Sequence, residues 1–351
     1  MSQTPASSSP LLHIDSLRVS VANSSGRFPV IDNISLSLNA GETLGLVGES
    51  GCGKSVTALS ILRLLPQPTI QIESGSIYFN GEDLLKKSHD AMRQLRGDRI
   101  AMIFQDPMTA LNPLHTIGRQ IEEVLVLHRP QMNATQRRTR VLELLDRVGM
   151  PAARERLSAY PHQLSGGMRQ RATIAMALAC EPALLIADEP TTALDVTVQS
   201  QVLSLLKDLQ RDSDMAVLFI THDLGVIAET CDHVAIMYAG RVIERADVQT
   251  LFAAPQHPYT HGLLNSLAAR APVPQQPLPA IRGQVPDVHQ RPAGCAFANR
   301  CSRRTDICVQ LPPLQATSVA NTHADHVVAC FHPVTAEQPF IYSDVIVETQ
   351  R

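Results

Sequence analysis

The sequence has 351 residues, 44% of them hydrophobic, which is enough for one large domain and a smaller one. The formal net charge is −3, and no block of like charge suits a nucleic-acid backbone or an anionic membrane surface, so no nucleic acid is expected as a partner. No apolar run approaches the ~20 residues of a membrane-spanning helix, so work at a membrane would require other subunits.

The chain opens with a polar stretch and then with alternating apolar residues. Residues 1–10, MSQTPASSSP, predict a disordered N-terminus and not a secretion signal, so we expect the protein to stay in the cytosol. Apolar residues alternate over 12–21 and again over 34–38, a pattern that predicts antiparallel strands.

The next apolar run, 44–47, leads into a glycine-rich turn and then into a helical pattern. Residues 48–55 fit the phosphate-binding pattern G-x-x-x-x-G-K-[ST]. Its glycines let successive N–H groups face inward around phosphate oxygens, and the positive end of the helix that begins near Lys54 adds to this cup. Lys54 is expected to reach the β- and γ-phosphates, and the hydroxyl of Ser55 is expected to bind Mg²⁺.

The predicted nucleotide contacts extend along this loop and back to one aromatic residue. Phe28 lies about twenty residues before the loop, where it either stacks on the adenine ring or is simply a buried strand residue. The full set expected to bind the nucleotide is Phe28, Gly48, Glu49, Ser50, Gly51, Cys52, Gly53, Lys54, Ser55 and Val56.

Beyond the loop, strands alternate with helices. Residues 75–81 and 100–104 are predicted strands, and residues 117–149 change to helical spacing, which indicates a helical insert. Residues 183–187 and 217–220 are short and fully apolar, as in parallel strands buried on both faces. The sequence therefore predicts an α/β fold whose ligand lies at the carboxyl ends of the strands.

Two carboxylates follow the buried strand at 183–187. Asp188 matches the acidic residue that holds Mg²⁺ in phosphate-loop enzymes, and Glu189 is placed to polarise an attacking water. The alternative role for such a pair is to cap the next helix.

Six segments occur in the order and at the spacing of the ABC-type ATPases, which the chain resembles over about two thirds of its length. These are the phosphate loop, FQDP with Gln105, LSGGMRQR, LLIADEP, ALD and ITHD with His222. The resemblance implies a mixed sheet core, an antiparallel β subdomain and a helical subdomain at about 110–180, all within residues 11–255. It implies ATP hydrolysis with Mg²⁺ held by Ser55, Gln105 and Asp188, and with Glu189, His222 and Gln105 as the catalytic residues.

The same resemblance assigns one segment to the ATP of a second subunit. The segment comprises Leu164, Ser165, Gly166, Gly167 and Met168, and the helix that Ser165 opens has a positive end that can face a phosphate. Met168 stands where the family usually has Gln, which we interpret as a subgroup trait. Asp195 ends the segment known in the family as the D-loop.

Within this family the chain is most similar to ATP-binding subunits of bacterial dipeptide and oligopeptide importers. The similarity rests on FQDPMTALNP from Phe104, YPHQLSGGM from Tyr160 and HPYT from His257. It implies a second ABC ATPase subunit, expected to be a different chain, two membrane-spanning permease subunits and an external substrate-binding protein. The chain would then work peripherally, at the cytoplasmic side of the inner membrane.

Other functions stay open at this stage. Importers of nickel, opines and antimicrobial peptides share many of these motifs. The motifs therefore predict the transport ATPase more specifically than they predict its cargo. A soluble ABC ATPase without a transport role is a second alternative, against which the single phosphate loop argues. A non-enzymatic module that only binds ATP is a third, against which Glu189 and His222 argue.

Residues 256–351 form the predicted C-terminal extension, with a proline-rich linker at 271–280. Cys295, Cys301, Cys308 and Cys330 cluster there, and in a reducing cytosol such thiols bind metal more often than they form disulfides. Their spacing is wider than in zinc ribbons, which favours a [4Fe–4S] cluster at least as much as zinc. The resemblance adds weight to the cluster, with zinc and free thiols as the alternatives. His323, His326 and His332 are expected to be solvated loop histidines.

Overall fold

A computed structural model describes residues 9–192, 194–267, 281–316 and 326–335. Most of the expected disordered N-terminus (1–10), the expected linker (271–280) and His323 lie outside these ranges. Within them, no helix combines the length and the apolar character that crossing a membrane would take.

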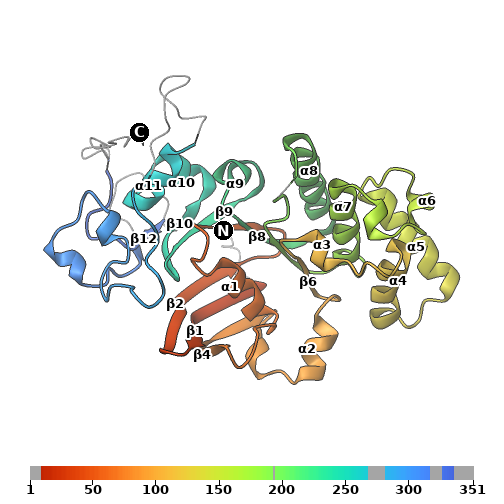
Figure 1. Ribbon diagram of the computed structural model, residues 1–351, viewed down its shortest axis with the longest axis horizontal. Helices are drawn as coiled ribbons and strands as arrows, with labels where there is room; N and C mark the ends of the chain where they lie inside the picture. Colours follow the sequence, from red (N-terminus) through yellow and green to blue (C-terminus); the bar gives the residue numbers. More distant parts are fainter. Residues whose placement is uncertain (1–8, 193, 268–280, 317–325, 336–351) are drawn as a thin grey trace, which may run out of the picture.

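Two β-sheets form the body of the molecule (Figure 1). The larger sheet has eight strands in the order β11-β12-β10-β9-β3-β8-β7-β6, and the smaller has four in the order β2-β1-β4-β5. The larger sheet comprises β3 Thr43–Val47, β6 Ile100–Ile103, β7 Leu184–Asp188, β8 Ala216–Thr221, β9 His233–Tyr238, β10 Arg241–Asp247, β11 Gln315–Ala316 and β12 Val327–Val328. The smaller sheet comprises β1 Leu12–Asn23, β2 Gly26–Leu38, β4 Ile70–Phe79 and β5 Glu82–Asp83.

The centre of the larger sheet is parallel, as predicted. Strand β3 lies between β8 and β9 and runs parallel to both, and β8 continues to β7 and β6 in the same direction. Every residue of β3, β7 and β8 is buried, because one face of these strands packs in a core with the smaller sheet and the other packs against helices, which leaves no face for polar side chains. The carboxyl ends of these strands therefore meet at one edge.

The smaller sheet is antiparallel, which confirms the prediction from the alternating residues. Strand β1 pairs with β2 on one side and with β4 on the other. Its alternate residues, such as Leu12, Ile14 and Val19, are buried in a core that this sheet shares with helix α1 (Lys54–Ile61).

A helical layer covers the far end of the larger sheet, beside β6 and β7 (Figure 1). It contains α3 Pro107–Ala110, α4 Ile117–His128, α5 Ala134–Arg147, α6 Ala153–Arg156 and α7 Gly166–Ala177. The residue directly before each of two helices supplies its N-cap: Thr116 caps α4, and Asn133 caps α5 with a capping box that Gln136 completes. The layer corresponds to the predicted helical insert. Four further helices are α2 His89–Leu95, α8 Val196–Ser213, α9 Leu224–Thr230 and α10 Val248–Ala253.

The C-terminal part packs at the opposite end of the larger sheet, away from the helical layer (Figure 1). Helix α11 (Pro258–Asn265) begins it, and β12 pairs antiparallel with β10, with Val328 opposite Glu244. The extension therefore continues the same sheet that carries the phosphate loop, so its side chains can reach the back of that loop.

Candidate nucleotide site

The phosphate loop joins the buried strand β3 to helix α1, and its glycines are needed for two different reasons. Gly51 and Gly53 have φ of +79° and +107°, which favour glycine. Gly48 does not have a positive φ, but a Cβ added to it would lie 2.3 Å from the carbonyl oxygen of Met237. Gly48 is therefore required for close packing against β9 and not for its backbone angle.

Lys54 is the first residue of α1 and is 6% exposed. Its Nζ donates hydrogen bonds to the carbonyl oxygens of Gly48 at 2.7 Å and Glu49 at 3.3 Å. Ser50 and Gly51 are exposed at the rim of the loop, whereas Cys52 is buried beneath it. The loop thus has an open face that a nucleotide can reach, with the lysine folded over its carbonyl groups.

Asp188 ends strand β7 beside the loop. The pKa of this carboxyl is raised overall, chiefly by burial. A hydrogen bond from the Ser55 side chain and the charge of Lys54 partly oppose this shift. Its Oδ1 atom is buried and has no hydrogen-bond partner within the described residues. A buried carboxylate oxygen without a partner, next to a serine hydroxyl, fits the oxygen donors that Mg²⁺ prefers.

The side chains of Gln105, Glu189 and His222 converge on one point at the strand ends. Gln105 Nε2 donates to Glu189 Oε2 at 3.0 Å, and His222 Nδ1 lies 3.3 Å from Glu189 Oε1. Glu189 has φ of +48°, and its backbone N–H donates to Ile220 of β8 at 2.8 Å. Thr192, which the sequence did not single out, also donates to Glu189 Oε2, at 2.9 Å. The tertiary structure thus places all three predicted catalytic residues in one cluster.

The surroundings of Glu189 keep it ionised. Burial alone would raise the pKa of its carboxyl, but hydrogen bonds from His222 and Thr192 and the charge of Lys54 lower it overall. The alternative that this carboxylate pair caps the next helix is not seen, because Asp195 caps α8 and accepts a hydrogen bond from the N–H of Val198 at 2.9 Å.

The segment expected to serve a second subunit lies in the helical layer. Ser165 caps helix α7, and its hydroxyl accepts from the N–H of Met168 at 3.4 Å. Gly166 and Gly167 form the first turn, and Leu164 is buried behind them. Helix α7, which begins with this segment, lies apart from α1 in Figure 1.

Phe28 lies on β2 and is half-buried. Its ring packs edge-on against His289 of the extension, with ring centroids 4.2 Å apart. Neither of the two roles considered for Phe28 includes this contact, which connects the predicted adenine-side residue with the C-terminal part.

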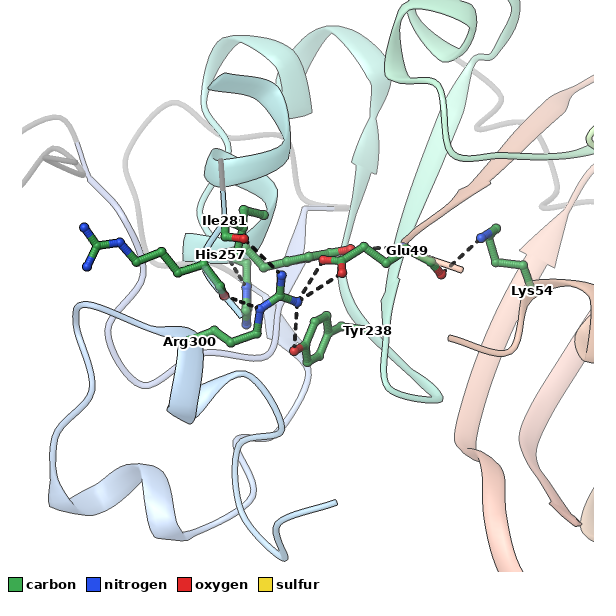
Figure 2. A network of polar contacts seen from close by, with 8 residues as sticks. Glu49, Lys54, Tyr238, His257, Ile281 and Arg300 are labelled. Atoms are coloured by element: carbon green, nitrogen blue, oxygen red, sulfur yellow. Dashed lines mark hydrogen bonds and ion pairs between the residues drawn. The ribbon is translucent and has the colours of Figure 1, made fainter. Parts of the chain in front are cut away.

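Glu49 differs from the rest of the loop because its groups point toward the extension (Figure 2). Arg300 Nη1 donates to its carboxylate oxygens at 2.9 and 3.1 Å, and the N–H of Glu49 donates to Tyr259 Oη at 3.1 Å. Sequence reasoning missed both partners. Tyr259 lies in the HPYT segment, which marked it, whereas nothing in the local sequence marks Arg300.

The buried carboxylate of Glu244 holds the start of the extension together. It is 0% exposed, and it accepts hydrogen bonds from the N–H groups of Gln256 at 2.7 Å and His257 at 2.9 Å. His326 Nε2 lies 2.8 Å from Glu244 Oε1, and His326 is 1% exposed. The expectation that His326 is solvated was therefore wrong, because strand pairing between β12 and β10 carries it into the interior.

His257 explains part of the HPYT segment. It caps helix α11 and its Nδ1 accepts from the N–H of Tyr259 at 3.1 Å. Burial lowers its pKa to about 4, although the nearby Glu244 raises it. This histidine is therefore neutral at neutral pH, as its role as a hydrogen-bond acceptor requires.

The four clustered cysteines line one pocket together with aromatic and proline side chains, Cys295, Cys301, Cys308 and Cys330 all contributing. Burial raises the pKa of Cys295 and Cys301, and raises that of Cys330 to about 12. The pocket has a volume of only about 10 Å³. Across the described ranges, no group of three or more His, Cys, Asp or Glu side chains is arranged to hold a metal ion.

Two protein-family patterns match the chain. Residues 31–192 match the ABC transporter family, and this range contains the phosphate loop, Gln105 and Glu189. Residues 243–308 match the C-terminal region of oligopeptide and dipeptide transporters, which spans Tyr259 and Arg300.

Several curated proteins are similar over most of their length. The chain is 51% identical over 301 residues to a probable peptide ABC transporter ATP-binding protein of Sinorhizobium fredii, covering 86% of this chain and 88% of that one. It is 50% identical over 305 residues to the dipeptide transport ATP-binding protein DppD of Bacillus subtilis, covering 87% and 90%. It is 46% identical over 332 residues to the oligopeptide transport ATP-binding protein OppD of Salmonella typhimurium, covering 95% and 96%.

Solved structures show the same fold. The ATP-binding cassette MJ0796, in a dimer bound to ADP and phosphate after hydrolysis, matches with a TM-score of 0.61 and 28% identity, covering 68% of this chain and 98% of that one. CbiO1 from Clostridium perfringens, part of an ABC transporter complex, matches with a TM-score of 0.60 and 27% identity, covering 70% and 92%.

Proposed function

Since this chain belongs to the peptide ABC transporter ATP-binding proteins and hydrolyses ATP to drive peptide import, we propose residue roles for that reaction. The cluster of Gln105, Glu189 and His222 carries the proposal. Glu189, kept ionised by its neighbours, accepts a hydrogen bond from the attacking water and orients it toward the γ-phosphate. His222 and Gln105 hold the Glu189 carboxylate in place, and His222 contacts the γ-phosphate.

The phosphate loop supplies binding and charge. The N–H groups of the loop and the start of α1 face the phosphates, and Lys54 reaches from beside the carbonyls of Gly48 and Glu49 to the β- and γ-phosphates. Ser55, Asp188 and Gln105 would hold Mg²⁺, and the bound ion would supply positive charge to offset the negative charge of the phosphate oxygens. The partnerless Oδ1 of Asp188 supports this assignment.

The signature segment, Leu164–Met168, serves the ATP of a second ATPase subunit, and Asp195 lies at the same interface. Its location in the helical layer, apart from α1, supports this role (Figure 1). The dimeric cassette MJ0796 offers a solved example of two such chains together. We propose that the second subunit here is a different chain.

A groove between the helical layer and β6 suits the permease subunits. It is lined by residues of both parts, including Met102, Phe104, Val124, Thr173 and Met176, and has a volume of about 220 Å³. Phe104, next to Gln105, is 42% exposed. A permease segment in this groove would contact the residue that precedes Gln105, so it would sense the nucleotide site. The chain then works peripherally at the cytoplasmic side of the inner membrane, with an external substrate-binding protein delivering peptide to the permease.

Reconstitution of the whole complex in proteoliposomes tests this function. ATP hydrolysis is expected to rise when a peptide and its binding protein are supplied, and peptide is expected to accumulate on the far side. If nickel or an opine stimulates hydrolysis and peptides do not, the transported substrate is that compound and not a peptide. Equal hydrolysis without any permease subunits would favour a soluble ATPase instead.

We also propose that Cys295, Cys301, Cys308 and Cys330 bind a metal centre, a [4Fe–4S] cluster first and zinc as the alternative. Four thiols around one pocket provide the donor set for either group. The pocket is too small for such a metal centre while the side chains keep their present positions, because a cavity of about 10 Å³ holds about one water molecule. Loading would therefore require the thiols to rotate apart, and no step of ATP hydrolysis depends on this centre.

Anaerobic purification followed by iron, sulfide and zinc analysis decides between the alternatives. About four iron atoms per chain would support the cluster, and one zinc atom would support the zinc site. A colourless protein with neither metal would leave free thiols, and Cys301→Ser is expected to abolish binding of whichever metal is found.

A further inference from the structure

Glu49, the second residue of the phosphate loop, is held by three of its own groups. Its carbonyl oxygen accepts from Lys54 Nζ at 3.3 Å, its N–H donates to Tyr259 Oη at 3.1 Å, and its carboxylate accepts from Arg300 Nη1 at 2.9 and 3.1 Å. Figure 2 shows Glu49 between the lysine on one side and the arginine on the other. The Cys52 N–H also donates to the carbonyl oxygen, at 3.3 Å, so the loop itself holds Glu49 through its carbonyl, and the C-terminal extension holds it through its N–H and its carboxylate.

The two contacts from the extension are rigid. Tyr259 is fully buried, and its ring packs edge-on against Tyr238 with centroids 4.7 Å apart. The side chain of Arg300 is 7% exposed. The Arg300 guanidinium donates to the carbonyl of Arg282 at 2.8 Å and to Tyr238 Oη at 3.2 Å, and it lies 5.9 Å from the centroid of the Phe297 ring. An arginine fixed at so many points holds a carboxylate at a defined position.

The contact from Lys54 is shared with the nucleotide during the reaction cycle. The Lys54 ammonium has three N–H donors, and reaching the β- and γ-phosphates takes at least one of them, so it shares its donors between the phosphates and the carbonyls of Gly48 and Glu49 when a nucleotide binds. Among the described residues, Tyr259 holds Glu49 through its N–H and Arg300 holds it through its carboxylate. Neither contact involves Lys54.

We propose that Arg300 and Tyr259 are positioning residues for ATP binding: through Glu49 they keep the phosphate loop in its binding shape while Lys54 binds the nucleotide. The proposal rests on the phosphate loop as the ATP site. It gives the C-terminal extension a task in nucleotide binding, although its residues lie behind the loop and touch no phosphate. A loop held from behind loses less conformational freedom when it closes on a ligand.

The first test replaces Arg300 in the full chain and measures the affinity for ATP with Mg²⁺ by calorimetry. Arg300→Met is expected to weaken ATP binding by about tenfold, on the scale of one charge-assisted hydrogen bond. Arg300→Lys keeps the charge but loses the forked geometry, so it is expected to fall between Arg300→Met and the unchanged protein.

Arg137→Met provides the matched control. Arg137 is also a partly buried arginine that pairs with a glutamate, since its Nε lies 3.1 Å from Glu122 Oε1, but this pair joins α4 to α5 far from the loop. Its loss is expected to lower the free energy of unfolding without changing the affinity for ATP. An equal loss of ATP affinity in Arg137→Met would show that general loosening, not the contact with Glu49, explains the Arg300 result.

A double-mutant cycle with Glu49→Gln tests whether Arg300 acts through Glu49. If it does, the combined variant binds ATP no more weakly than the weaker of the two single variants. Losses that simply add would assign Arg300 a structural role and overturn the proposal.

Tyr259→Phe removes one oxygen atom and leaves the N–H of Glu49 without its partner. It is expected to weaken ATP binding by about fivefold, whereas Tyr238→Phe, which removes a hydroxyl that meets Arg300 but not the loop, is expected to do less. If Arg300→Met and Tyr259→Phe both keep full ATP affinity while Lys54→Ala loses it, the proposal is wrong and the ATP site stands. If Lys54→Ala also keeps full affinity, the ATP site itself is misassigned.

Discussion

The front and the back of the phosphate loop are built in opposite ways. On the front, Ser50, Gly51 and Gln105 are exposed, and the side chain of His222 is 64% exposed. On the back, Tyr259 is 0% exposed and the side chain of Arg300 is 7% exposed, and both are held by several partners. The reacting side is left open because it must receive a nucleotide, while the supporting side is closed by packing.

This difference separates two kinds of residue in one small region. Front residues change partners during the reaction, so replacing them should change catalysis or binding and leave the fold intact. Back residues keep their partners, so replacing them should change stability or the shape of the loop. The following predictions test that division, beginning with the largest expected effect.

Glu189→Gln is expected to lower kcat for ATP hydrolysis by the assembled complex by about 10² to 10⁴-fold, because an amide does not accept a proton from water as a carboxylate does. Nucleotide affinity is expected to stay within a factor of about two. Steady-state hydrolysis and a separate binding measurement distinguish these effects. A variant with unchanged kcat would remove Glu189 from its proposed role.

Lys54→Ala is expected to weaken ATP binding by on the order of 100-fold, because the phosphates lose their charged partner. The melting temperature is expected to change little, since the hydrogen bonds of Nζ within the described part of the chain go to two loop carbonyls alone. Calorimetric titration with ATP and thermal unfolding measure both properties. A large loss of stability would place Lys54 with the back residues and break the division.

Below neutral pH, the back is expected to weaken through His257. Its pKa is lowered by burial to about 4, from the ordinary value of 6.5. Between pH 4 and 6.5 this histidine is therefore protonated in the unfolded chain but not in the folded chain. The free energy of unfolding falls as pH drops from 6.5 toward 4, by up to about 1.4 kcal/mol per pH unit. Chemical unfolding at a series of pH values measures this slope.

His257→Asn is the control for that pH dependence. Asparagine also accepts a hydrogen bond as a helix N-cap, so it can replace His257 at the start of α11 without titrating. This part of the slope is expected to disappear in the variant. An unchanged slope would assign the pH dependence to other groups.

Gly51→Ala is expected to have the smallest effect, about 1 kcal/mol in the free energy of unfolding. The φ of Gly51 is +79°, but a Cβ there would meet nothing within 4 Å. Gly48→Ala should cost more, since its Cβ would lie 2.3 Å from the carbonyl oxygen of Met237. Thermal unfolding of the two variants side by side checks whether the back of the loop is indeed the tighter side.

Much of the front can be predicted from the sequence because its residues follow short local patterns. The glycine spacing predicts the loop between β3 and α1, and the apolar runs before Asp188 and before Thr221 predict strands whose ends meet. Parallel pairing then brings Glu189 and His222 together, although 33 positions separate them in the chain. Such signals are strong because the chemistry needs these residue types at fixed positions within one element.

The back could not be predicted in the same way. Arg300 reaches Glu49 across 251 positions, and His326 meets Glu244 only because β12 pairs with β10. The HPYT segment marked Tyr259, but its hydrogen bond to the loop depends on how α11 packs. His326 shows the same limit, since a polar residue in an irregular segment gives no local sign of burial.

The sequence by itself therefore determined the loop and the strands, which follow from local spacing and from burial on both faces of a sheet. Its resemblance to the ABC-type ATPases indicated the family and predicted the catalytic residues. Only the tertiary structure decided that Arg300 and Tyr259 hold the loop from behind, that Gly48 is needed for space and that His326 is buried. The physical reason is that these contacts join side chains from distant segments. Their partners are chosen by packing and by the need to satisfy every buried polar group, and no local pattern records that choice.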